Sequence, residues 1–140
     1  PKGKRGVGLT KASNFGFNFE KYVKKESQNI KLILQIESIE AINNLEKILN
    51  LKNISGTLLG PYDLSSSLGV IGKLENQLVK NAIKKYEVIS NKKNIPMGIH
   101  MAQPNFNKIK LAYKKKYKFV AVGTDMIFLG NSCKDFIKKI

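Results

Sequence analysis

The sequence predicts an α/β fold with a parallel sheet, and three observations support that prediction. Apolar runs of strand length alternate along the chain with longer segments whose apolar residues recur at helical spacing. The run over residues 30–36 is apolar at nearly every position, which is typical of a parallel strand covered on both faces. Polar side chains gather where the runs end, at the edge that binds ligands in such folds. Strands that alternate with helices form parallel sheets with right-handed crossovers.

The predicted elements follow one another as four strand–helix units. Residues 1–17, rich in Gly, Lys and Asn, are expected to form a loop, and residues 18–29 a short polar helix. The strands are expected over residues 30–36, 54–59, 96–102 and 119–123. The helices are expected over residues 39–49 after Ser38 as N-cap, over residues 75–91, from Pro104 to Tyr113, and over residues 132–140. Residues 65–72 are small and are expected to form a flexible loop. Four such units form half of an eight-stranded barrel or a small open sheet, and the residues alone leave both open.

The composition is that of one soluble globular domain, expected over residues 1–140, with 42% hydrophobic and 25% charged residues. No run is long and apolar enough to span a bilayer, no secretory signal opens the chain, and we expect no membrane partner. The single cysteine, Cys133, forms no internal disulfide, so a cytoplasmic location is expected. Cys133 is interpreted as a small buried apolar side chain. The chain begins at Pro1 and not at Met, from which we expect a fragment of a longer protein.

The net charge of +15 raises the question of a polyanionic partner. The lysines are dispersed along the chain, however, and recur on the polar sides of the predicted helices, for example at Lys84-Lys85 and Lys114-Lys115-Lys116. We interpret them as a solvated surface and expect no nucleic-acid partner. A non-catalytic module that binds a polyanion stays as the alternative, and the same charge attracts small anionic substrates.

Two carboxylates stand at the ends of neighbouring predicted strands. Glu37 follows the first strand, and Asp63 follows Gly60-Pro61 at the end of the second. Hard divalent cations prefer oxygen ligands and keep positions open for water or substrate, so this pair suits such an ion. Residues two apart in a strand share a face, which places Gln35 beside Glu37. Gly60 leaves room for close approach, and Pro61 fixes the turn that presents Asp63.

Three further polar residues lie at the same predicted edge. His100, the only histidine, shares a strand face with Gly98 and Ala102, and we interpret it as lining a pocket, with a hydrogen-bonded core histidine as the alternative. Thr124 is expected at the mouth of that pocket. Asp125 is interpreted as a structural residue that accepts hydrogen bonds from loop amides.

Three segments together resemble the HpcH/HpaI aldolase family: Gln35-Ile36-Glu37, Gly60-Pro61-Tyr62-Asp63-Leu64-Ser65 and Val120-Ala121-Val122-Gly123-Thr124-Asp125. The opening Pro1–Gly8 is similar to the segment that follows the fourth barrel strand in that family. The resemblance covers essentially the whole chain, with the segments in order. It implies the C-terminal half, strands five to eight, of a (β/α)8 TIM barrel.

The resemblance also implies an activity and a set of ligands. These enzymes are class II, metal-dependent lyases that cleave a 2-oxo-3-deoxy or 4-hydroxy-2-oxo acid to pyruvate and an aldehyde. Glu37 and Asp63 fall on the two ligands of Mg²⁺, Mn²⁺ or another divalent ion, and Gln35 falls on a side chain that binds the oxo acid. Gly60, Pro61, Tyr62 and Asp63 fall on the substrate loop, where the backbone N–H groups of Tyr62 and Asp63 hold the carboxylate. Tyr62 departs from the Ala common in relatives, and relatives often have an apolar residue at His100.

The resemblance leaves the acid–base groups unassigned. The family's catalytic Arg and its His–Asp pair lie in the first half of the barrel, and Arg5, the only arginine, does not match that position. We therefore expect the 140 residues alone to be inactive and the full-length parent to be active, as a homotrimer or hexamer with the last helix packed on a neighbour. A citrate-lyase-like or malyl-CoA-lyase-like enzyme acting on an acyl-CoA is the alternative within the same metal chemistry.

Overall fold

The computed structural model describes Lys4 and residues 6–140, and it divides them into two compact units. One unit ends at Lys31 and the other begins at Leu32. The expectation of a single domain over residues 1–140 stays a prediction.

The first unit is a series of short helical turns. The expected helix over residues 18–29 is confirmed as helical, although its turns differ in type. The expected loop over residues 1–17 is wrong where Lys11–Gly16 form a 3-10 turn, and its part at residues 1–3 and 5 lies outside the described residues. The elements are η1 (Lys11–Gly16), α1 (Phe19–Lys21), η2 (Tyr22–Glu26) and η3 (Ser27–Asn29).

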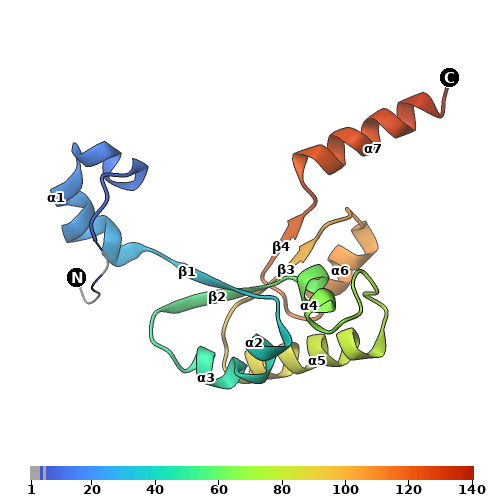
Figure 1. Ribbon diagram of the computed structural model, residues 1–140, viewed down its shortest axis with the longest axis horizontal. Coiled ribbons are helices and arrows are strands. Elements are labelled where there is room, and N and C mark those ends of the chain that lie inside the picture. The colour runs from blue at the N-terminus through green and yellow to red at the C-terminus, as the bar shows by residue number, and fades with distance from the viewer. Residues whose placement is uncertain (1–3, 5) are drawn as a thin grey trace. The chain divides into compact units, whose positions relative to one another are not determined.

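The second unit is a four-stranded parallel sheet with helices between its strands (Figure 1). The strands are β1 (Leu32–Ile36), β2 (Ile54–Leu59), β3 (Met97–Met101) and β4 (Phe119–Val122), and they lie side by side in chain order. The helices are α2 (Ile39–Asn43), α3 (Leu45–Leu49), α4 (Pro61–Ser67), α5 (Gln77–Lys92), α6 (Phe106–Lys114) and α7 (Asp125–Ile137). The predicted α/β class with parallel strands is confirmed. Within the described residues, no helix has the length and apolar character needed to cross a bilayer.

Side-chain caps explain where several helices begin. The Ser38 hydroxyl accepts from the Ala41 amide at 3.1 Å, as expected for the N-cap of α2. Asn105 caps α6 in the same way, accepting from the Lys108 amide at 2.9 Å. Thr124 caps α7, which therefore begins at Asp125, so the expected start at Ser132 was wrong.

Two other expectations about helices also need correction. The helix expected over residues 39–49 is divided into α2 and α3 at Asn44, whose backbone leaves the helical region. The loop expected over residues 65–72 begins later, because Ser65 to Ser67 belong to α4. The Ser65 hydroxyl is buried and donates to the Tyr62 carbonyl at 2.6 Å, which satisfies it within the helix.

The core lies between one face of the sheet and the helices α2 to α6. Ile36 of β1 and Leu59 of β2 are register partners on that face, and they form one buried cluster with Leu64 of α4 and Tyr86 of α5. The Tyr86 hydroxyl reaches the Thr57 hydroxyl at 2.7 Å, so both buried oxygens have a partner. Burial raises the pKa of Tyr86 to about 12, because the phenolate would lose its hydration.

The opposite face of the sheet is packed differently. Its residues alternate with the core residues, and Phe119 of β4 is the register partner of Gly98 of β3 on this face. A Cβ atom added to Gly98 would stand only 2.0 Å from the Phe119 ring, and one added to Gly56 would stand 3.6 Å from it. The ring therefore lies across both glycines and fills the space that two side chains would need.

Candidate functional site

The candidate site is built where β1 and β2 end beside each other. Ile36 and Leu59 are paired in register, and the Gly60 amide donates to the Ile36 carbonyl at 3.0 Å. Glu37 follows β1 directly, and α4 begins at Pro61 directly after Gly60, so Asp63 lies in its first turn. Parallel pairing thus brings the two acidic residues, distant in sequence, to the same edge of the sheet.

The two carboxylates converge over Gly60. A Cβ atom placed on Gly60 would lie 3.4 Å from Glu37 Oε2 and 3.5 Å from Asp63 Oδ2. Both oxygens therefore border the one volume that the missing side chain leaves open, together with the Glu37 Cβ at 3.2 Å, and any residue larger than glycine would intrude into it. The expectation that Gly60 gives room for close approach agrees with this geometry.

Gln35 orients the Glu37 side chain. Its Nε2 donates to Glu37 Oε2 at 2.6 Å, as the shared strand face predicts. This hydrogen bond fixes the carboxylate oxygen that faces Gly60 and leaves the other amide hydrogen of Gln35 available to a ligand. Glu37 is half-buried, whereas Gln35 and Asp63 are exposed, so the site is open to solvent.

This set of donors suits a hard divalent cation. Carboxylate oxygens are the ligands that Mg²⁺ and Mn²⁺ take from proteins, and Mg²⁺ commonly binds through one or two carboxylates while it keeps several waters. The described part of the chain holds no group of three His, Cys, Asp or Glu residues that could bind a metal together. Two carboxylates such as Glu37 and Asp63 could hold such an ion from one side, with its remaining positions open to water or substrate.

A sequence profile of the HpcH/HpaI aldolase/citrate lyase family matches residues 1–132. The chain belongs to this family. A hydroxypyruvate/pyruvate aldolase of Agrobacterium fabrum is 31% identical over 140 residues, which cover 96% of this chain and 50% of that protein. A 2-keto-3-deoxy-L-rhamnonate aldolase of Shigella dysenteriae is 33% identical over 138 residues, which cover 94% of this chain and 49% of that protein. This HpcH/HpaI chain thus spans about half the length of the curated relatives that it matches.

The fold is that of solved HpcH/HpaI structures. A family protein from Burkholderia cenocepacia superposes with a TM-score of 0.86 at 23% identity, over 99% of this chain and 53% of that one. The predicted likeness to half of the family's barrel is confirmed.

The other predicted site residues of this HpcH/HpaI chain lie on neighbouring elements. His100 is in β3 on the face of Gly98, opposite Ala121, and Tyr62 is 44% exposed in α4. Thr124 is the N-cap of α7, with its hydroxyl accepting from the Ile127 amide at 3.4 Å. Asp125 accepts from the Met126 amide at 2.8 Å, in agreement with a structural role. Cys133 is exposed, so its interpretation as a buried residue was wrong.

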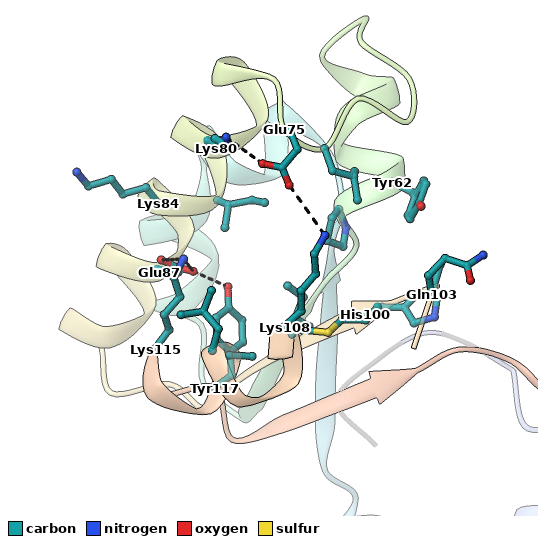
Figure 2. A pocket seen from close by; sticks show the side chains of 18 residues that line it. Tyr62, Glu75, Lys80, Lys84, Glu87, His100, Gln103, Lys108, Lys115 and Tyr117 are labelled. Atoms are coloured by element: carbon teal, nitrogen blue, oxygen red, sulfur yellow. Dashed lines mark hydrogen bonds and ion pairs between the residues drawn. The ribbon is translucent and has the colours of Figure 1, made fainter. Parts of the chain in front are cut away.

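Sequence reasoning missed a cavity of about 680 Å³ between α5 and α6, which Figure 2 shows from close by. Tyr62 and His100 are among its lining residues. From the sequence, the charged residues along its walls are expected only as parts of a solvated surface or carry no assigned role. They are Glu75, Lys80, Lys84, Glu87, Lys108 and Lys115. The one signal in the sequence was the spacing Lys80–Lys84, which places two lysines on the same side of a helix.

Proposed function

We propose that this chain provides the divalent-metal site of an aldolase that cleaves a 2-oxo-3-deoxy or 4-hydroxy-2-oxo acid to pyruvate and an aldehyde. The observation that carries the proposal is the convergence of Glu37 and Asp63 over Gly60 in a chain of the HpcH/HpaI family. Because the chain spans about half of its curated relatives, we assign metal binding to these residues and turnover to a complete barrel.

The roles of the residues follow from their positions. Glu37 and Asp63 would bind Mg²⁺ or Mn²⁺, and Gln35 would hold Glu37 and donate its free amide hydrogen to the oxo acid. Tyr62 and Asp63 lie in the first turn of α4, where backbone N–H groups have no acceptor within the helix and favour an anion, here the substrate carboxylate. When bound, a divalent ion supplies Lewis-acid stabilisation of the negative charge left on the 2-oxo acid as the C3–C4 bond breaks.

The remaining site residues are proposed to shape the pocket. Gly60 and Pro61 keep the backbone close to the ligand, and His100 and Thr124 would line the pocket and its mouth on the side of β3 and β4. The catalytic acid–base group is not assigned to any residue of this chain. A cytoplasmic location and a small-molecule 2-oxo acid as partner remain parts of the proposal.

Metal titration of the 140-residue protein tests the site directly. We expect the unaltered chain to bind Mn²⁺ saturably in isothermal titration calorimetry, and Glu37→Gln and Asp63→Asn each to weaken binding at least tenfold. Glu40→Gln is the matched control, because Glu40 is an exposed glutamate in the first turn of α2. Equal affinities in all four proteins would overturn the metal assignment, and binding that responds only to salt would favour the polyanion module.

Turnover is tested in the complete barrel. The same two substitutions should lower kcat/KM for a 2-oxo-3-deoxy acid by at least a hundredfold, whereas Glu40→Gln should leave it unchanged. The 140 residues alone should not cleave the substrate. Cleavage of an acyl-CoA thioester instead of the oxo acid would move the assignment to the lyase alternative and keep the metal site.

We also propose that the protein forms a homo-oligomer through α7. Phe136 and Ile137 on this helix are 67% and 68% exposed, and none of its residues is buried. Apolar side chains so exposed mark a surface for association. Light scattering should show a trimer or hexamer of the complete protein, and a Phe136→Ser, Ile137→Ser double variant should dissociate it. An unchanged mass would exclude α7 as the interface.

A further inference from the structure

The cavity between α5 and α6 combines an apolar floor with a charged rim. Ile83 of α5, Ile99 of β3 and Leu111 of α6 contribute to its lining, and its volume of about 680 Å³ falls in the range of small-molecule sites. Glu37, Asp63 and Gln35, by contrast, do not line it. The cavity therefore does not include the two carboxylates or Gln35, although Pro61, Tyr62 and His100 of the predicted site border it.

One carboxylate joins the two walls of the cavity. Glu75, in the turn before α5, places Oε2 at 2.9 Å from Lys80 Nζ on α5 and Oε1 at 3.9 Å from Lys108 Nζ on α6 (Figure 2). All three side chains are more than half exposed. The two lysines lower the pKa of Glu75, and Lys80 has the larger effect. Ion pairs exposed to this degree are weak, so the Glu75 carboxylate can leave the two lysines at little cost.

The far end of the cavity carries a second carboxylate that is already neutralised. Glu87 is only 16% exposed, and it accepts from Lys115 Nζ at 3.0 Å and from the Tyr117 hydroxyl at 3.1 Å. In Figure 2 the cluster of Glu87, Lys115 and Tyr117 lies away from Tyr62 and Gln103, which border the other end of the cavity. Lys84 adds a further positive charge to the lining. The rim is therefore positive overall, and the Glu75 carboxylate occupies the place where two lysines from different helices approach each other.

We propose that this cavity binds an anionic amphiphile, a ligand with an anionic head group and an apolar body. The head group takes the place of Glu75 between Lys80 and Lys108, and the apolar body covers Ile83, Ile99 and Leu111. The charge of the rim selects an anion over a cation or a neutral ligand, and the apolar floor selects a chain over a small inorganic anion. Glu75 acts as an internal competitor that an incoming anion must displace.

Decanoate, below the concentration at which it forms micelles, is the probe for this site. Calorimetric titration should show saturable binding to the 140-residue protein. The double variant Lys80→Gln, Lys108→Gln should weaken binding at least tenfold, whereas Glu75→Gln should tighten it about threefold to tenfold, because the competitor loses its charge. Lys114→Gln is the matched control, since Lys114 also lies on α6 but does not line the cavity.

The head group and the chain are tested with related ligands. 1-Decanol should bind at least tenfold more weakly than decanoate, and acetate should not saturate. A comparison of the affinities for decanoate and decyl phosphate shows whether the head-group position between Lys80 and Lys108 prefers a carboxylate or a phosphate. Absence of saturable decanoate binding would overturn the proposal. Decanoate binding to Glu75→Gln that is weaker than or equal to binding to the unaltered chain would also overturn it. An equal loss of decanoate affinity in Lys114→Gln and in the double variant would overturn it too, because a general attraction to the lysine-rich surface would affect both proteins alike.

Discussion

The two faces of the β1–β4 sheet differ in how far the helices of this chain cover them. The face of Leu59, Thr57 and Met97 is covered by this chain's own helices, and these residues are buried. The face of Ile33, Gln35 and Phe119 is only partly covered within the described residues, and Ile33 is 49% exposed. The first face therefore holds the fold together, and the second carries the candidate ligands.

This difference places the core and the candidate site on opposite faces of one sheet. Alternate residues of a strand point to opposite faces, so Ile36 can belong to the core while Gln35 and Glu37 belong to the candidate site. Substitutions on the two faces should consequently have different consequences. Those on the helix-covered face should change the free energy of unfolding, whereas those at the carboxyl edge of the other face should change ligand affinity.

The largest effect is expected for Tyr86→Ala on the helix-covered face. The ring is fully buried, its hydroxyl pairs with Thr57, and its centroid lies 6.4 Å from that of Tyr117. Removal of a buried aromatic side chain leaves a cavity, so the free energy of unfolding should fall by about 3–5 kcal/mol. Urea denaturation measures this. A loss below about 1 kcal/mol would mean that this face does not carry the stability assigned to it.

Alkaline pH should weaken the same face. Burial raises the pKa of Tyr86 to about 12 and raises that of Tyr117 as well. Above pH ~10 the unfolded chain releases the tyrosine proton while the folded chain keeps it. The free energy of unfolding is therefore greatest below pH ~10, and between pH ~10 and ~12 it should fall by about 2–3 kcal/mol through Tyr86. Urea midpoints between pH 8 and 12 measure this loss.

Tyr86→Phe is the control for that experiment. Below pH ~10 this variant should be less stable by about 1–2 kcal/mol, because it leaves the Thr57 hydroxyl without its partner. Above pH ~10 its free energy of unfolding should fall less steeply than that of the unaltered protein. The titration of the many lysines is common to both proteins and cancels in the comparison. Parallel pH curves would show that Tyr86 does not contribute.

A smaller effect is expected for Gly98→Ala on the opposite face. The new Cβ would collide with the Phe119 ring, which must move, at a cost of about 1–3 kcal/mol. The same substitution in a Phe119→Ala background should cost under about 1 kcal/mol, because the ring is gone. Urea denaturation of the four proteins gives this double-mutant cycle. Additive effects would contradict the packing of Phe119 across Gly98.

Much of the helix-covered face could be predicted from the sequence. The apolar runs located all four strands, and β2 begins and ends at the predicted residues, because burial on a parallel sheet is visible as apolar composition. The start of α7 was missed because Thr124 was interpreted as a pocket residue, although Thr before Asp is an ordinary helix start. Cys133 was placed inside because its residue type favours burial, whereas α7 buries none of its residues.

The candidate site was predictable in part. Strand period and the residue types pointed to Gln35, Glu37 and Asp63, and the structure brings the two carboxylates together over Gly60. The cavity between α5 and α6 was not predictable, because it depends on how far apart two helices pack. Glu75, Lys80 and Lys108 meet only in three dimensions, and in the sequence they are ordinary surface charges.

The smallest effect on stability is expected for Gln35→Ala, which sharpens the contrast between the two faces. Gln35 is exposed and donates one hydrogen bond to Glu37, so its loss should change the free energy of unfolding by less than about 0.5 kcal/mol. Mn²⁺ affinity should nevertheless fall about threefold to tenfold, because Glu37 Oε2 loses the group that orients it. Ile33→Ser, on the same strand and face, should leave Mn²⁺ affinity unchanged. If both variants weaken Mn²⁺ binding equally, the loss reflects a disturbed strand, and Gln35 has no positioning role.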